Sequence, residues 1–124
     1  MTAGDLGRVY QAGETIVKQG EVGECMYVVQ SGKVEVMRED GASQVKLAEL
    51  KQGDFFGEMA LFDKDVRSAT VRAQGEARLL TIDKKMFLRK VHEDPSLAYR
   101  VMEKMSRRIR ELNEQVSRLT NTPS

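Results

Sequence analysis

Glycines divide the first two thirds of this chain into short β-type runs. Around Val34 and Val36 the apolar and polar residues alternate, which is the period of antiparallel strands with one buried face. The continuous apolar run 26–29 predicts a strand buried on both faces. Asp40-Gly41, between two runs, predicts a tight hairpin. Strands that recur at roughly ten-residue spacing predict a sandwich or jelly roll over about residues 9–83. The glycines between the runs are Gly13, Gly20, Gly23, Gly32, Gly53 and Gly75.

After Asp83 the apolar period becomes helical. Asp83 can cap a short helix that ends near His92, and Asp94 followed by Pro95 is a second start signal, since Asp is a preferred cap and Pro fits the first helical position. Nothing breaks the second helix before about Thr120. We therefore expect C-terminal helices over about residues 84–120. At 124 residues one domain is expected, over residues 9–124, after a loose lead-in over residues 1–8.

The long helix carries an apolar stripe with heptad spacing. β-Branched residues at one core position, Ile109 and Val116, with leucine at the other, favour a parallel dimer. The stripe covers only about two and a half heptads, so packing on the β-domain of its own chain is the alternative. We predict a homodimer through this helix. The members of the stripe are Met102, Met105, Ile109, Leu112, Val116 and Leu119.

Composition is that of an ordinary globular chain, with 40% hydrophobic and 31% charged residues. The formal net charge of +1 provides no overall attraction to nucleic acid or to an acidic membrane. No apolar run is long enough to cross a membrane, and the N-terminus lacks the apolar segment of a secretory signal. The single cysteine, Cys25, fits a reducing compartment. We expect a cytoplasmic chain that binds neither nucleic acid nor membrane by itself.

Three devices for holding phosphate occur within a dozen residues. Gly57 allows the backbone to come close to a ligand. Residues 58–61 can form one helical turn whose free N–H groups suit an anion. Arg67 presents a planar fork of donors that matches phosphate. Glu58 can only accept hydrogen bonds when ionised, so its natural ligand partner is a hydroxyl, and a sugar hydroxyl beside a phosphate indicates a nucleotide. A surface salt bridge between Arg67 and Glu58 is the alternative.

The stretch Phe56-Gly57-Glu58-Met59-Ala60-Leu61, followed by Arg67-Ser68-Ala69, resembles the phosphate-binding cassette of cyclic nucleotide-binding domains. The stretch 16–32 is similar to the other signature of that family, a turn Gly20-Glu21-Val22-Gly23 followed by an apolar strand and Gly32. The two signatures occur in the family's order, and the resemblance covers about residues 9–116. It implies a mainly β fold, an eight-stranded antiparallel β-roll (jelly roll) with a short cassette helix and a long C-terminal helix.

The resemblance also implies a function without catalysis. The chain would sense a cyclic purine mononucleotide, cAMP or else cGMP, and couple its binding to the C-terminal helices and to dimerisation. Arg67 would neutralise the cyclic phosphate, N–H groups near Ala60 and Leu61 would add donors, and Glu58 would accept from the ribose 2′-hydroxyl. The base would lie on Leu47 and under Leu112 and Asn113. The implied cradle is Gly57, Glu58, Met59, Ala60, Leu61, Arg67 and Ser68. No metal and no further cofactor is expected.

The chain departs from the catabolite-activator branch of the family in two ways. Leu112 and Asn113 stand where that branch has two hydroxyl side chains that hold adenine, so the preference between cAMP and cGMP stays open. No residues remain for the DNA-binding helix-turn-helix of that branch, and the chain is expected to be a stand-alone module or a fragment of a larger effector. A degenerate domain that only dimerises and an enzyme on a cupin-like roll are the alternatives. His92 is the only histidine, which disfavours a zinc or iron site.

Overall fold

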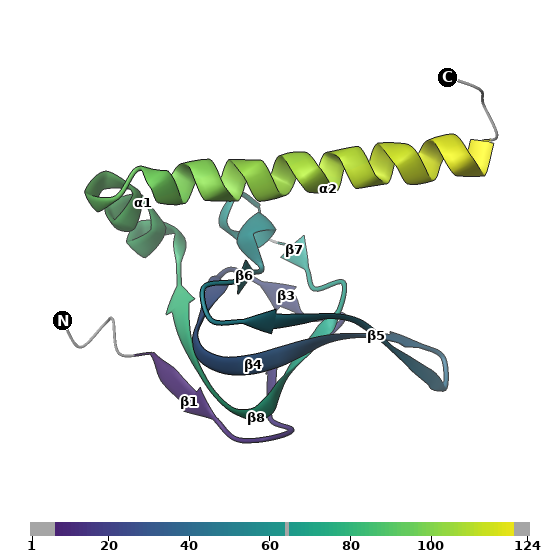
Figure 1. The fold of residues 1–124 in the computed structure, drawn as a ribbon, viewed down its shortest axis with the longest axis horizontal. Coiled ribbons are helices and arrows are strands. Elements are labelled where there is room, and N and C mark those ends of the chain that lie inside the picture. Colours follow the sequence, from purple (N-terminus) through teal and green to yellow (C-terminus); the bar gives the residue numbers. More distant parts are fainter. Residues whose placement is uncertain (1–6, 64, 121–124) are drawn as a thin grey trace. The chain divides into compact units, whose positions relative to one another are not determined.

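A computed structural model describes residues 7–63 and 65–120 of the chain (Figure 1). It has two compact parts, Met1–Met86 and Phe87–Ser124. The predicted lead-in over residues 1–8 falls mainly on residues 1–6, which lie outside the described ranges. The strands of the first part are β1 Arg8–Tyr10, β2 Thr15–Val17, β3 Val22–Gly23, β4 Met26–Asp40, β5 Ser43–Lys51, β6 Phe55–Phe56, β7 Asp65–Val66 and β8 Thr70–Ile82.

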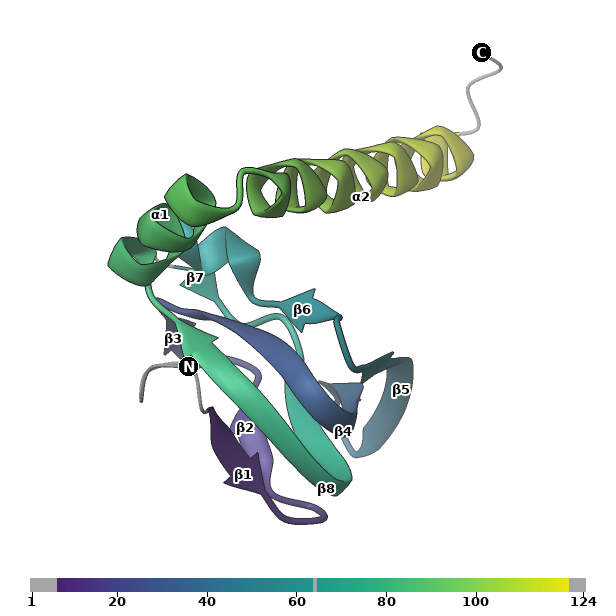
Figure 2. The same cartoon turned by 60° about the vertical axis from the view of Figure 1, so that its left-hand side comes forward.

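All strand pairs of the described residues are antiparallel, which confirms the predicted β-roll. Six strands form one sheet in the order β1-β8-β4-β5, with β2 also on β8 and β6 also on β4, while β3 pairs with β7. The two longest strands, β4 and β8, bend together through the whole part (Figures 1 and 2). Their register shifts on either side of Ser31. Gly32 follows at φ +77°, and a Cβ there would collide with the carbonyl oxygen of Glu76, so the bend requires glycine.

The hairpin between β4 and β5 turns at Gly41, which has φ +65°, as the sequence predicted. Inward side chains of β4, β6 and β8, including Val29, Val34, Phe56 and Leu79, form the core. The expectation that the run 26–29 is buried on both faces is wrong in part. Met26 and Val29 are buried, but Tyr27 and Val28 are only half-buried. Tyr27 packs against the core that contains Val29 and Phe56, and its ring stacks on Phe56 at a centroid distance of 5.2 Å.

Helix α1 spans Lys84–Glu93 and helix α2 spans Ser96–Thr120. The carboxylate of Asp83 accepts from the N–H of Met86 at 2.7 Å, and that of Asp94 accepts from the N–H and hydroxyl of Ser96 at 3.2 and 2.6 Å. Both predicted caps are confirmed. The bonds from Ser96 lower the pKa of Asp94. Neither helix is long and apolar enough, over its described residues, to span a membrane.

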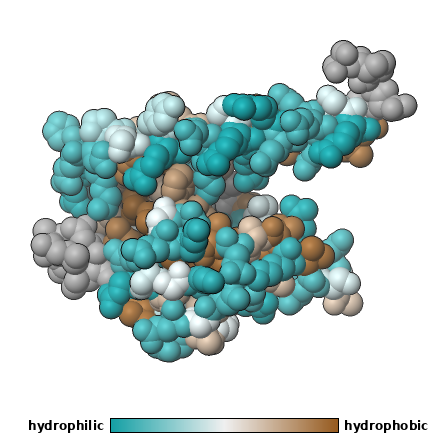
Figure 3. Space-filling view, in the orientation of Figure 1, coloured by the Kyte–Doolittle hydropathy of each residue, from teal (hydrophilic) through white to brown (hydrophobic). Residues whose placement is uncertain are grey.

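The two ends of α2 differ in burial. Near its start, Leu97 and Val101 are buried, whereas further along Ile109, Leu112 and Val116 are at least half exposed in the single chain. The face of α2 seen in Figure 3 is mostly hydrophilic. The apolar stripe therefore occupies a limited part of the helix surface, as the heptad spacing predicts.

Candidate functional site

Residues Glu58–Leu61 form a single turn of 3-10 helix, called η2, as predicted. Gly57 precedes it in the left-handed region at φ +79°, and a Cβ there would lie 2.5 Å from Nη1 of Arg67. Glycine is therefore required at this position for conformation and for space. Glu58, Ala60 and Leu61 are buried, whereas Met59 is exposed. The turn thus places the buried carboxyl group of Glu58 directly after Gly57, the residue whose backbone lies close to the Arg67 side chain.

Arg67 follows β7 and is fixed at its backbone and at its side chain. Its N–H donates to the carbonyl oxygen of Glu21 at 2.8 Å, and its carbonyl accepts from the N–H of Gly20 at 2.9 Å. Nη2 donates to the carbonyl oxygen of Cys25 at 2.6 Å, and Nη1 lies 3.5 Å from the carbonyl oxygen of Gly57. The guanidinium carbon is 5.9 Å from the ring centroid of Tyr27. The geometry thus joins the two sequence signatures through one side chain.

The Arg67 guanidinium has no carboxylate partner among residues 7–63 and 65–120. The alternative of a salt bridge with Glu58 is therefore not what the structure shows. Arg67 is only 9% exposed, and a buried charge is unfavourable unless it is paired. A guanidinium carries five N–H donors, and two hydrogen bonds to carbonyl oxygens leave donors for an anionic ligand.

The other predicted cradle residues differ in their exposure and in the elements that carry them. The N–H of Ala60, expected to face a ligand, instead donates to the carbonyl oxygen of Gly57 at 3.2 Å, because a 3-10 turn closes bonds between residues i and i+3. Ser68 is exposed next to Arg67. Leu47 lies half exposed on β5. Leu112 and Asn113 belong to α2, in the second part, and their approach to the cassette stays a prediction.

Two hollows adjoin these residues. One of about 670 Å³ is lined by Ala60 and Leu61 of η2 together with Cys25, Asp83 and Lys84, among others. A smaller one of about 170 Å³ is lined by Arg67 with residues from β2, β3 and the start of β4. The described residues contain no group of three or more His, Cys, Asp or Glu side chains arranged to hold a metal ion.

Three contributors to the site were not predicted from the sequence. The carbonyl of Cys25 and the ring of Tyr27 both contact the Arg67 side chain. Gly23 is the third, because a Cβ there would overlap the guanidinium of Arg67. The sequence could have indicated Gly23, because it is the second glycine of the turn signature Gly20-Glu21-Val22-Gly23. Burial raises the pKa of the Cys25 thiol and the charge of Asp83 raises it further, while Arg67 opposes both.

Comparison with known proteins is consistent with this geometry. Residues 7–94 match the profile of the cyclic nucleotide-binding domain. The chain is 39% identical over 80 residues to a cAMP-dependent protein kinase regulatory subunit of Mucor circinelloides, covering 64% of this chain and 19% of that protein. It is 34% identical over 114 residues to the cyclic AMP receptor protein of Thermus thermophilus, covering 91% and 53%.

The fold has a solved counterpart. The crystal structure of the Thermus thermophilus catabolite activator protein superposes with a TM-score of 0.81 at 34% identity, over 91% of this chain and 54% of that one. The chain thus spans about half the length of one of these relatives and about a fifth of the other.

Proposed function

Since the chain belongs to the cyclic nucleotide-binding domain family, we propose that it senses a cyclic purine mononucleotide, with cAMP as the preferred ligand. One observation carries the proposal. Arg67 is a buried cation without a carboxylate partner among the described residues, held beside the left-handed Gly57 and the buried Glu58. A cyclic phosphate would supply the missing negative charge, and such charge-assisted bonds are the stronger kind.

Each cradle residue has a role in this proposal. Arg67 directs its remaining donors to the phosphate oxygens, and the hydroxyl of Ser68 adds one more. Glu58 accepts from the ribose 2′-hydroxyl. Leu47 provides an apolar surface for the base. Gly57, Met59, Ala60 and Leu61 complete the turn that shapes the cradle.

In this proposal the long helix α2 would contact the base of the bound nucleotide. Leu112 would cover the base, and the amide of Asn113, which can both donate and accept, would read the purine edge. Because an amide can satisfy either adenine or guanine, cGMP is the competing ligand. The sensor would perform no chemistry.

We propose that residues 9–124 act as one regulatory module, alone or within a larger effector, and that α2 forms a homodimer. The exposed stripe of α2, with Ile109, Leu112 and Val116, supports the dimer because such a stripe is ordinarily covered. Ligand binding would shift the C-terminal helices and so alter the dimer. The proposal includes a cytoplasmic setting, which the single free thiol of Cys25 suits.

Mass spectrometry of nucleotide released by denaturing the purified protein tests the proposal directly. Calorimetry of nucleotide-free protein with cAMP, cGMP and 5′-AMP then ranks the ligands. We expect cAMP to bind most tightly and the linear 5′-AMP to bind far more weakly. If neither cyclic nucleotide is recovered or binds, the chain is a degenerate module of the family. A stoichiometric bound metal would instead favour the cupin-like enzyme.

A further inference from the structure

The backbone of Arg67 is held by a tight turn outside the cassette, formed by residues 18–21. The N–H of Glu21 donates to the carbonyl oxygen of Lys18 at 3.2 Å, and Gly20 adopts φ +91°, a geometry typical of a type II turn with glycine third. The turn presents the N–H of Gly20 and the carbonyl of Glu21 to the two backbone groups of Arg67. The position of Arg67 therefore depends on the position of this turn.

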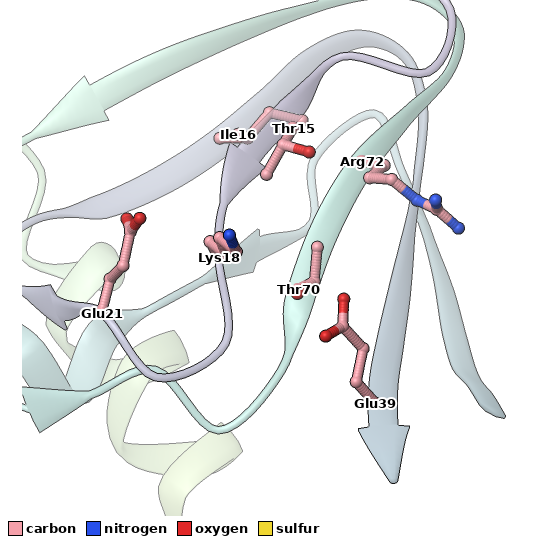
Figure 4. A pocket seen from close by; sticks show the side chains of 7 residues that line it. All are labelled: Thr15, Ile16, Lys18, Glu21, Glu39, Thr70 and Arg72. Carbon is pink, nitrogen blue, oxygen red and sulfur yellow. The ribbon is translucent and has the colours of Figure 1, made fainter. Parts of the chain in front are cut away.

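Gln19, the second residue of the turn, anchors it at three points. Its N–H donates to Oγ1 of Thr70 at 3.0 Å. Its side-chain Nε2 donates to the carbonyl oxygen of Glu39 at 3.0 Å, and its Oε1 accepts from the N–H of Glu39 at 2.8 Å. Figure 4 shows Thr70 and Glu39 beside the loop that joins Lys18 to Glu21. The turn is thus tied both to the start of β8 and to the end of β4.

The two bonds between the Gln19 side chain and Glu39 take the place of strand pairing on the side of β4 where β8 has ended. On one side Glu39 pairs with Gln44 of β5, but β8 begins at Thr70, which is paired with Met37, so β8 does not reach Glu39. A glutamine side chain has a carbonyl acceptor and an NH2 donor group. It can therefore meet both the N–H and the carbonyl of Glu39, as a hydrogen-bonded residue on a neighbouring antiparallel strand does. Gln19 therefore continues the sheet by one residue and connects the β4–β5 hairpin to the turn that holds Arg67.

We propose that Gln19 is a positioning residue for ligand binding: it holds the 18–21 turn, and through the turn the phosphate-binding Arg67, against the end of β4. This inference rests on the proposed function. Gln19 does not contact the ligand. Its removal would let the turn and the Arg67 backbone move, so that the guanidinium would sample several positions and bind phosphate less tightly.

The chain contains a matched control for this residue. Gln52-Gly53 forms a second turn of the same kind, with the N–H of Asp54 donating to the carbonyl oxygen of Lys51 at 2.9 Å and Gly53 at φ +92°. Gln52 is exposed, and the structure shows no hydrogen bond of its side chain to the described residues. A substitution there has the same intrinsic effect on the turn without the anchoring role.

Two measurements test the inference on the full chain. Gln19→Met keeps the side-chain length and removes both polar groups. We expect its affinity for cAMP, measured by calorimetry, to fall about tenfold through two lost hydrogen bonds, with less than about a twofold change for Gln52→Met. Amide hydrogen exchange in ligand-free protein should speed up in Gln19→Met at Arg67 and Gly20, and at Glu39, whose N–H loses its acceptor. It should stay unchanged in the rest of β4 and in β8.

Thr70→Val is the second variant, in case Gln19→Met fails to fold. It keeps the side-chain shape and removes only the acceptor for the N–H of Gln19. We expect a smaller loss of cAMP affinity and a smaller rise in exchange at Arg67 and Gly20. Unchanged cAMP affinity and unchanged exchange at Arg67 in Gln19→Met would overturn the inference. Equal losses in Gln19→Met and Gln52→Met would also overturn it. If the wild-type protein binds no cyclic nucleotide, the proposed function is rejected, and the exchange data alone decide whether Gln19 fixes Arg67.

Discussion

The guanidinium of Arg67 donates a hydrogen bond of 2.6 Å to the main-chain carbonyl of Cys25, 42 residues earlier in the chain. This bond connects the cassette to the apolar strand of the upstream signature. It holds the arginine in place before any ligand arrives. A side chain that is already ordered loses less conformational entropy on binding, so the bond favours recognition of an anion although it makes no contact with one.

Arg67→Ala should abolish measurable cyclic nucleotide binding at micromolar concentration. Loss of one partner of a buried charged pair weakens binding by about 2–5 kcal/mol. Calorimetry measures the loss. Arg38→Ala removes an exposed arginine of β4 and serves as the control, with unchanged affinity. Unaltered binding in Arg67→Ala would reject the cradle, provided that circular dichroism shows both variants folded.

Gly23→Ala should weaken ligand binding and also lower the stability of the fold. The new Cβ would overlap the guanidinium of Arg67, so this buried side chain must give up its hydrogen bond to the carbonyl of Cys25, a loss of about 1.5–3 kcal/mol for a hydrogen bond of a charged group. In the Arg67→Ala background the same substitution should have no further effect on the melting temperature. Thermal melts of wild type, of each single variant and of the double variant measure stability. Titration of wild type and Gly23→Ala with cAMP measures the loss of affinity. A large additional loss of stability in the double variant would place the collision elsewhere.

Features that depend on local stereochemistry were predictable from the sequence. The caps at Asp83 and Asp94, the hairpin turn at Gly41 and the single turn after Gly57 all depend on residues within a few positions of each other. The alternation of apolar residues predicted antiparallel strands in a sandwich or jelly roll, because it fixes which face of each strand is buried, and the eight-stranded roll followed from the family resemblance.

Contacts that depend on strand register were not predictable. The sequence indicated that Gly57 and Arg67 lie together, but nothing local indicates that Cys25 offers its carbonyl or that Gln19 completes the sheet at Glu39. These contacts require the register of β4 against β8, which shifts on either side of Ser31. Sequence patterns set the faces of strands but do not locate such shifts.

Glu58 should distinguish ribose from deoxyribose. It is 4% exposed, and a buried acceptor that loses its donor weakens binding by about 1–3 kcal/mol, more if it is charged. Competition titration should show 2′-deoxy-cAMP binding at least tenfold more weakly than cAMP to wild type. In Glu58→Gln this preference should shrink. Equal affinities of wild type for the two nucleotides would mean that Glu58 faces another group.

The Cys25 thiol should report on Arg67 through its ionisation. Burial, and next the charge of Asp83, raises the pKa of Cys25 above its ordinary value of 9.0, while Arg67 lowers it. The folded chain therefore keeps the thiol proton to higher pH than the unfolded chain does. The resulting contribution to stability is complete below pH 9.0 and is lost as pH rises through the folded-state pKa.

Iodoacetamide labelling against pH measures this directly, because the chain has one cysteine and only the thiolate reacts. The midpoint for the native protein should lie above that for the chain unfolded in urea. Arg67→Ala should move it higher still, since an attractive positive charge is removed. A native midpoint at or below the unfolded one would show that the thiol is not in the environment described.

The apolar stripe of α2 should hold two copies of the chain together. Ile109→Glu places a carboxylate in the seam, where an unpaired buried charge is strongly unfavourable, so the variant should sediment as a monomer with its β-roll intact. Arg107→Glu puts the same residue on the opposite face of the helix, two positions away, and should remain dimeric. Sedimentation velocity at several concentrations, with and without cAMP, compares the three proteins.

The same experiment measures coupling between the helix and the nucleotide. If cAMP tightens the dimer, dimerisation must tighten cAMP binding by the same factor, because the coupling free energy is shared. Ile109→Glu should then bind cAMP more weakly than wild type by that factor, although residue 109 is not in the proposed cradle. A wild-type chain that stays monomeric at high concentration in both ligand states would reject the seam, and the stripe would then be assigned to packing within one chain.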